Sequence, residues 1–271
     1  MPKISVICGA YNMANCYSLD KSIKSILGQS FSDFEFIICD DGSTDNTYEL
    51  LSEYARQDQR IKLIRNEKNL GLAATLNRCI SVADGEYIAR HDCDDYAAPE
   101  RFEKQAAYLD LHPEVSVLGT FAYLFDENGV WGEMRFPEKI EKKDFLFCSP
   151  HQHGSVFFRK EVLIKAGGYK VSKQTRRTED YELFMRIHGF AKSENLPEFL
   201  YYFCEDKNTL ARRKYRYRID EAKVRYRGFK ELGLMPRGIF YVLKPLIVGL
   251  IPARLLRWLK NKLLKTRTVK K

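Results

Sequence analysis

The chain has 271 residues, of which 45% are hydrophobic and 30% charged, enough apolar material for one large α/β domain with an appendage or for two small domains. Its seven cysteines include no C-x-x-C pair, which argues against a disulfide framework or a structural zinc site, and the immediate strand pattern at the N-terminus indicates no signal peptide, so we expect a reduced, cytoplasmic protein. The net charge is +9, but the charge is unevenly distributed: residues 207–271 carry 20 Lys/Arg and 3 Asp/Glu, whereas the rest of the chain carries 25 Lys/Arg and 33 Asp/Glu. A basic tail of this kind suggests an anionic partner, either a membrane or a nucleic acid.

The N-terminal part of the chain alternates short apolar runs with segments of helical spacing. This β-α-β-α-β-α-β pattern predicts a doubly wound, mostly parallel sheet with helices on both faces. The expected strands are Ile4–Cys8, Phe34–Cys39, Ile61–Arg65 and a run ending near Asp92, and the expected helices are Tyr17–Leu27, a segment ending near Gln57, and Leu72–Ala83.

Polar loops follow each of these strands. Ligands of doubly wound sheets bind beyond the carboxyl ends of the strands. The loops that contain Tyr11, Asp41, Gly71 and Asp92 all follow strands in this way, so we expect them to converge on one site.

Three carboxylates, Asp92, Asp94 and Asp95, gather at the end of the fourth strand. Because they repel one another, a cation or a basic side chain should neutralise them. Arg90, directly before the cluster, could pair with one of them or approach the phosphates. Carboxylates favour Mg²⁺ or Mn²⁺ over zinc. The cluster therefore predicts a metal-assisted phosphate site, with a solvated acidic loop as the alternative.

The second half of the chain is less regular. Thr178 precedes Glu179 and Asp180 at a predicted helix start, where two acidic residues could simply compensate the helix dipole. The other expected elements are a helix over Glu100–Leu111, a strand over Ser116–Phe125 with a hairpin turn after it, a strand over Gly154–Arg159, and a short helix over Lys160–Ala166 that Gly167 and Gly168 end.

Together, five motifs in this order resemble the inverting, nucleotide-sugar-dependent glycosyltransferases of family 2. The resemblance covers about residues 3–205 and implies a GT-A fold for residues 1–206, with a nucleotide-sugar-binding half (1–98) and an acceptor-binding half (99–206). The motifs are Ile4 to Asn12, the DDGSTD sequence of Asp40 to Asp45, Asn69 to Ala74 followed by Asn77, the D-x-D-D sequence of Asp92 to Asp95, and Gly167-Gly168-Tyr169 followed by Glu179-Asp180.

The resemblance also implies residue roles. Asp180 would be the general base in a single displacement that inverts the anomeric carbon. Asp94 and Asp92 would bind Mn²⁺ or Mg²⁺ and, through it, the diphosphate of a UDP-sugar. The residues implied in nucleotide-sugar binding are Ala10, Tyr11, Asp41 (as acceptor for the uracil N–H), Asn69, Gly71, Asp92 and Cys93, and those expected near the acceptor or diphosphate are His153 and Glu179.

The chain departs from the family pattern at Cys8 and Gly9, where many relatives have Pro and Thr or Ser. It has no Q-x-x-R-W motif after Asp180, so we expect a non-processive enzyme acting on a glycan or lipid-linked glycan, as in bacterial surface-polysaccharide synthesis. A nucleotidyltransferase is one rival, although the loop after the first strand lacks the expected Lys or Arg. A nucleic-acid-binding protein with a degenerate sugar-nucleotide domain is the other.

The basic segment 207–271 is expected to form amphipathic helices. Arg212 to Lys230 interleaves Arg and Lys with Tyr, which is typical of nucleic-acid-binding proteins, but an apolar stretch from Ile239 to Ala253 and an amphipathic segment from Arg254 to Lys265 follow it. The apolar stretch is too short to span a bilayer. It favours a peripheral anchor on the anionic inner face of the cell membrane and makes nucleic acid an unlikely partner. A helical pair packed back on the catalytic domain is the alternative.

Overall fold

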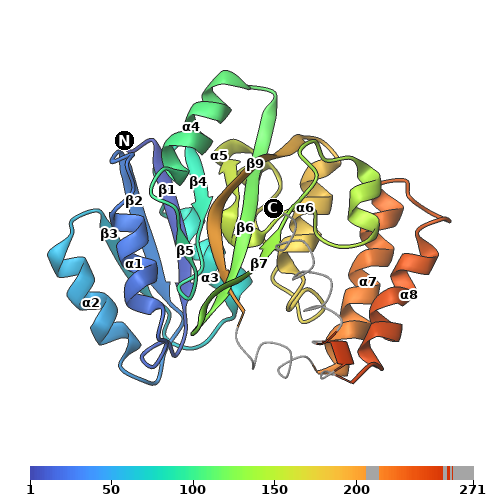
Figure 1. Ribbon diagram of the computed structural model, residues 1–271, viewed down its shortest axis with the longest axis horizontal. Coiled ribbons are helices and arrows are strands. Elements are labelled where there is room, and N and C mark those ends of the chain that lie inside the picture. Colours follow the sequence, from blue (N-terminus) through green and yellow to red (C-terminus); the bar gives the residue numbers. More distant parts are fainter. Residues whose placement is uncertain (206–213, 253–254, 257, 259–271) are drawn as a thin grey trace.

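The computed structural model describes residues 1–205, 214–252, 255, 256 and 258 (Figure 1). Within this part of the chain, nine strands form one sheet in which β7 pairs only with β6 and the others follow the order β3-β2-β1-β4-β8-β6-β9-β5. The strands are β1 (Ile4–Ala10), β2 (Phe34–Asp40), β3 (Ile61–Arg65), β4 (Tyr87–Arg90), β5 (Tyr96–Ala97), β6 (Val115–Asp126), β7 (Gly129–Met134), β8 (Phe157–Arg159) and β9 (Lys192–Cys204).

The first four strands form the predicted parallel, doubly wound unit. Every residue of β1 and β2 except Gly9 and Glu35 is buried, because helices cover both faces. Helices α1 (Leu19–Leu27) and α2 (Thr47–Gln57) pack on one face, and α3 (Leu72–Ser81) packs on the other. The chain reverses its winding between β1 and β4, and this switch point is where such sheets bind ligands.

Beyond β4 the sheet is mixed. β8 pairs antiparallel with both β4 and β6, whereas the long strands β6 and β9 run parallel. The parallel character expected from the sequence therefore belongs mainly to the N-terminal half. Three further helices cover the two faces of this part of the sheet. Helix α4 (Arg101–Leu111) packs on the same side as α1, and α5 (Lys160–Lys165) and α6 (Glu179–His188) pack on the same side as α3.

One predicted strand is shorter than expected. Only Phe157–Arg159 of the segment 154–159 forms strand β8, while His153–Ser155 forms a single 3₁₀ turn, η2. The backbone N–H of Ser155 donates to the carbonyl of Gln152, and its hydroxyl donates to the same oxygen at 2.9 Å, so the side chain favours the turn over the strand. A second 3₁₀ helix, η1, covers Lys142–Leu146.

The basic segment forms two helices that lie against the body of the molecule, α7 (Tyr215–Glu231) and α8 (Ile239–Gly249), as Figure 1 shows. Gly228 of α7 lies so close to α6 that a Cβ there would be 2.4 Å from the Sδ of Met185. Arg225 is buried and donates to the carbonyls of Leu146 and Phe147. The structure thus adopts the packed-back arrangement for these two helices.

The expected amphipathic helix over 254–265 lies mostly outside the described residues. In the portion of the chain that the structure covers, no helix has both the length and the apolar character needed to cross a bilayer.

Candidate functional site

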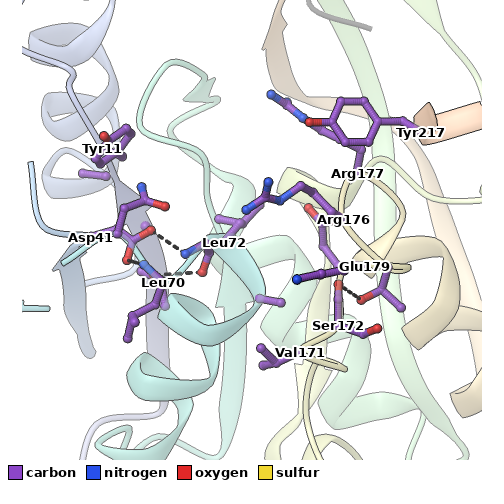
Figure 2. Close-up of a pocket in the computed structure, with 18 residues that line it drawn as sticks. Tyr11, Asp41, Leu70, Leu72, Val171, Ser172, Arg176, Arg177, Glu179 and Tyr217 are labelled. Atoms are coloured by element: carbon purple, nitrogen blue, oxygen red, sulfur yellow. Dashed lines mark hydrogen bonds between the residues drawn. The ribbon is translucent and has the colours of Figure 1, made fainter. Parts of the chain in front are cut away.

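Two adjoining cavities open at the carboxyl ends of the parallel strands. The first has a volume of about 680 Å³ and the second about 530 Å³. Arg177, Glu179 and Tyr217 line both cavities, and we call them the border residues. Figure 2 shows Tyr217 and Arg177 on the opposite side of the first cavity from Tyr11 and Asp41. The two cavities are therefore halves of one continuous site.

The first cavity is formed by the loops after β1 and β2, as the sequence predicts. Tyr11 is 44% exposed and offers a ring face to this space, whereas Ala10 is buried in its wall. Asn69 and Gly71 contribute from the loop before α3. These four predicted residues come together although the chain separates them by up to about sixty positions.

Asp41 also lines the first cavity, but its carboxylate has a structural task. It accepts hydrogen bonds from the backbone N–H groups of Leu70 and Gly71, both at 2.9 Å, and from the side-chain amide of Asn66 at 2.8 Å. Gly71 has φ +89°, a conformation that favours glycine. Asp41 therefore fixes the loop that forms one wall, a role that its motif alone did not reveal.

The opposite wall of the first cavity is basic. Lys173, Arg176 and Arg177 are exposed there, in the loop that precedes α6. Arg177 has φ +71°, which is strained for a residue with a side chain, and such strain is concentrated at functional sites. The sequence analysis missed this wall; its signal was the basic pair directly before Thr178.

Asp92 lies in the wall of the second cavity, where it pairs with a buried cation. The guanidinium of Arg90 is fully buried and donates from Nη2 to Oδ1 of Asp92. Burial alone would lower the pKa of Arg90, but Asp92 raises it above its ordinary value, so Arg90 stays charged. The predicted pairing of Arg90 with a carboxylate is confirmed.

The other two acidic residues of the loop differ in their surroundings. Asp95 is fully buried and accepts hydrogen bonds from Oη of Tyr201 at 2.8 Å and from the backbone N–H of Cys204 at 2.6 Å. Burial, and then the charges of Asp94 and Asp92, raise its pKa well above the ordinary value. Asp95 thus anchors the loop to β9, while Asp92 and Asp94 remain partly exposed.

Asp92, which lines the second cavity, and Asp94, two positions further on, both keep partial exposure. One or two carboxylates of this kind fit a magnesium-type ion, which commonly completes its shell with water and substrate phosphates. In the described residues, no group of three or more His, Cys, Asp or Glu side chains could hold a metal by itself.

Cys93 differs from the expectation of a ligand-binding role. Its side chain is 3% exposed, packs in the hydrophobic core, and lines neither cavity. Cys93 is buried between Asp92 and Asp94, which both keep partial exposure, and of these three residues Asp92 lines the second cavity. A contact between the Cys93 side chain and a bound nucleotide-sugar is thus not supported.

Asp180 lies at the first turn of α6 and lines the second cavity. Burial, followed by the neighbouring charge of Glu179, raises its pKa from 3.8 to about 7. A carboxyl group with this pKa can exchange a proton near neutral pH. Burial likewise raises the pKa of Glu179, which lies at the border of the two cavities.

His153 also lines the second cavity, where its Nε2 lies 2.8 Å from Oη of Tyr169. Burial, and then the positive charge of Arg90, push the pKa of His153 well below the ordinary value. His153 is therefore neutral at physiological pH and does not present a positive charge to a phosphate.

The sequence comparisons agree with this geometry. The family described as Glycosyl transferase family 2 matches residues 5–167. The chain is 42% identical to the Putative glycosyltransferase EpsE of Bacillus subtilis over 255 residues, covering 93% of this chain and 91% of that protein. It is 29% identical to the Amylovoran biosynthesis glycosyltransferase AmsE of Erwinia amylovora, covering 95% of this chain and 98% of that protein.

Solved structures share the fold. S. aureus TarS 1-349 in complex with UDP-GlcNAc superposes with a TM-score of 0.69 and 21% identity, over 92% of this chain and 71% of TarS. Mannosyltransferase PcManGT from Pyrobaculum calidifontis, in complex with GDP-Man and Mn²⁺, gives a TM-score of 0.63 and 17% identity, over 97% and 80% of the respective chains. On the match to the family and the identity with EpsE, the chain belongs to glycosyltransferase family 2, has the GT-A fold, and is a glycosyltransferase.

Proposed function

We propose that this glycosyltransferase moves one sugar at a time from a UDP-sugar to an acceptor hydroxyl, with inversion at the anomeric carbon. The observation that carries this proposal is the position of Asp180, a proton-accepting group in the second cavity, next to a first cavity with an aromatic face, a loop fixed by Asp41 and a basic wall. In this proposal the nucleoside binds in the first cavity, the diphosphate extends toward Asp92 in the wall of the second cavity, and the acceptor binds beside Asp180 in that second cavity.

The uracil ring would lie on Tyr11, which has an accessible ring face, with Asp41 at the edge of the base. Lys173, Arg176 and Arg177 would face the diphosphate and offset its charge. TarS was solved with UDP-GlcNAc and with UDP, which supports a uridine nucleotide as the donor carrier.

Asp94 and Asp92 would hold a divalent cation, for which Mn²⁺ or Mg²⁺ fits the carboxylate donors. The Mn²⁺ in PcManGT supports a metal requirement in proteins of this fold. When bound, the ion supplies Lewis-acid stabilisation of the charge on the departing diphosphate. Arg90 pairs with Asp92 from the interior and limits the repulsion between the carboxylates.

The Asp180 carboxylate would accept the proton of the acceptor hydroxyl as the hydroxyl oxygen attacks the anomeric carbon and the bond to the diphosphate breaks. Attack comes from the face opposite the leaving group, so the configuration inverts. Because the acceptor binds beside Asp180, proximity supplies much of the rate advantage.

The acceptor would be a glycan or lipid-linked glycan of bacterial surface polysaccharide. The names of AmsE and of the O-antigen biosynthesis glycosyltransferase WbnJ of Escherichia coli, which is 34% identical over 200 residues, support polysaccharide assembly.

We further propose that helix α8 rests on the anionic inner face of the cell membrane. Its outward face is apolar, with Phe240, Leu243, Ile247 and Leu250 exposed by 78%, 47%, 62% and 75%. These residues recur at helical spacing, and the surrounding segment is strongly basic, which is the pattern of an interfacial helix.

Flotation with anionic liposomes tests the membrane assignment. We expect Ile247→Glu in α8 to reduce co-flotation strongly, whereas Ile164→Glu in α5 should not, because Ile164 is equally exposed (61%) but lies elsewhere. Equal flotation of the two variants would contradict the assignment.

Calorimetric titration tests the donor site. UDP should bind more tightly with Mn²⁺ than without it, GDP should bind more weakly, and Asp94→Ala should abolish the effect of the metal on UDP binding. Asp180→Asn should keep the same UDP affinity while losing sugar transfer. A folded protein that binds neither nucleotide, or an Asp180→Asn variant with full transfer activity, would refute the proposal.

A further inference from the structure

Helix α7 contributes side chains to both cavities although it follows the segment that matches the family. Tyr217 is a border residue, and Arg218, Glu221 and Arg225 line the second cavity with it. Positions 218, 221 and 225 recur every three or four residues, so they share one face of the helix. The basic segment that the sequence suggested as a membrane anchor is therefore partly a wall of the site.

This wall is held firmly relative to the proposed base. Arg225 is 4% exposed and lies 5.0 Å from the ring centroid of Tyr181, the residue next to Asp180. The close approach of Gly228 to Met185 brings α7 against α6, the helix that carries Asp180. A ligand bound on α7 would consequently keep a fixed distance from the Asp180 carboxylate.

The chemistry of the wall suits a sugar. Glu221 accepts hydrogen bonds from Arg218 at 3.0 Å and from Arg225 at 3.1 Å, which orients a carboxylate and a guanidinium toward the second cavity. Planar charged groups of this kind bind vicinal hydroxyls, because each offers two donors or two acceptors in a plane. Apolar side chains, Met134, Phe136 and Phe203, line the same cavity, and Tyr217 offers an aromatic ring at its border.

We propose that α7 binds the acceptor sugar: the ring of Tyr217 packs against the sugar face, while Arg218 and Glu221 hydrogen-bond its hydroxyls and direct one of them to Asp180. This inference rests on the proposed function and adds the acceptor class and the residues that recognise it. The proposal places acceptor recognition in a helix that follows the segment matched by the family model.

The test uses the full-length protein with UDP bound and a panel of p-nitrophenyl glycosides as acceptor probes. Saturation-transfer NMR identifies glycosides that bind, and transfer from UDP-GlcNAc, UDP-glucose and UDP-galactose identifies a reactive pair. With that pair, Tyr217→Ala and Arg218→Ala should each raise the acceptor KM by about tenfold, and Tyr217→Phe should restore the wild-type value.

A matched control lies on the same helix. Tyr226 is exposed (47%) and lines neither cavity, so Tyr226→Ala should leave the KM for the acceptor and the KM for the UDP-sugar unchanged. The UDP affinity of Arg218→Ala should stay within about twofold of the wild type, because Arg218 lines only the second cavity. A general loss of folding would lower the UDP affinity and the melting temperature together, which separates damage from recognition.

The outcomes are distinct. Unchanged acceptor KM in Tyr217→Ala and Arg218→Ala would overturn the inference while leaving the proposed function intact. Binding of UDP without binding of any glycoside would also overturn it, since the second cavity would then not recognise a sugar. Absence of UDP binding to the wild type would instead refute the proposed function.

Discussion

Replacing Asp180 by Asn should stabilise the protein while abolishing transfer. The environment of Asp180 raises its pKa from 3.8 to about 7, so the folded state holds the charged form less well than the unfolded chain does. Each pKa unit corresponds to about 1.36 kcal/mol, so the difference amounts to about 4 kcal/mol of lost stability above pH 7. Because the carboxyl group is only partly buried, we expect about 2–4 kcal/mol.

The sign of the pH dependence follows from linkage. Below pH 3.8 the Asp180 carboxyl is protonated in both states and carries no penalty. As the pH rises from 3.8 toward 7, the unfolded chain releases its proton first, and the folded state loses relative stability until the folded pKa is passed. The neutral Asn side chain does not titrate. The gain in the free energy of unfolding of Asp180→Asn over the wild type should therefore be small near pH 4.5 and largest at pH 8.

Urea unfolding of the wild type and of Asp180→Asn at pH 4.5 and pH 8 measures this difference. Asp58→Asn is a matched control for which the change in the free energy of unfolding should have the opposite sign. The hydrogen bond from Arg60 lowers the pKa of Asp58, so the charged carboxylate stabilises the folded state. This variant should therefore be less stable than the wild type at pH 8, and the difference should shrink at low pH. An Asp180→Asn variant with the same advantage at both pH values, or with none at pH 8, would refute the reasoning.

Two further predictions concern the site, and a third concerns the packing of the turn that ends α5. The kcat/KM for transfer should rise about tenfold per pH unit below pH 7 and level off above it, because Asp180 must be deprotonated, and a flat profile from pH 5 to 8 would exclude Asp180 as the base. Asp41→Ala should cost about 3 kcal/mol in urea unfolding and weaken UDP binding, because the N–H groups of Leu70 and Gly71 lose their acceptor. Gly168→Ala should cost about 1–2 kcal/mol more than Gly167→Ala, because both glycines have positive φ but only at Gly168 would a Cβ meet Oδ1 of Asn77 at 2.5 Å; equal costs would contradict this steric account.

The sequence by itself determined the N-terminal half of the sheet and the placement of its loops. The alternation of apolar runs and helical spacing is a local property, so it predicted β1 to β4 and α1 to α3 to within a few residues. Because parallel strands place their carboxyl ends at one edge, the same pattern brought Tyr11, Asp41 and Gly71 to one cavity.

The tertiary structure decided what depends on contacts between distant segments. Arg90 neutralises Asp92 because burial in the sheet places its guanidinium beneath the loop, and Cys93 faces the core rather than the ligand side. Periodicity indicated helices after β9 but could not tell whether they face lipid or protein, since either surface accepts an apolar stripe. Close packing at Gly228 settles this for α7 and makes Tyr217 part of the site.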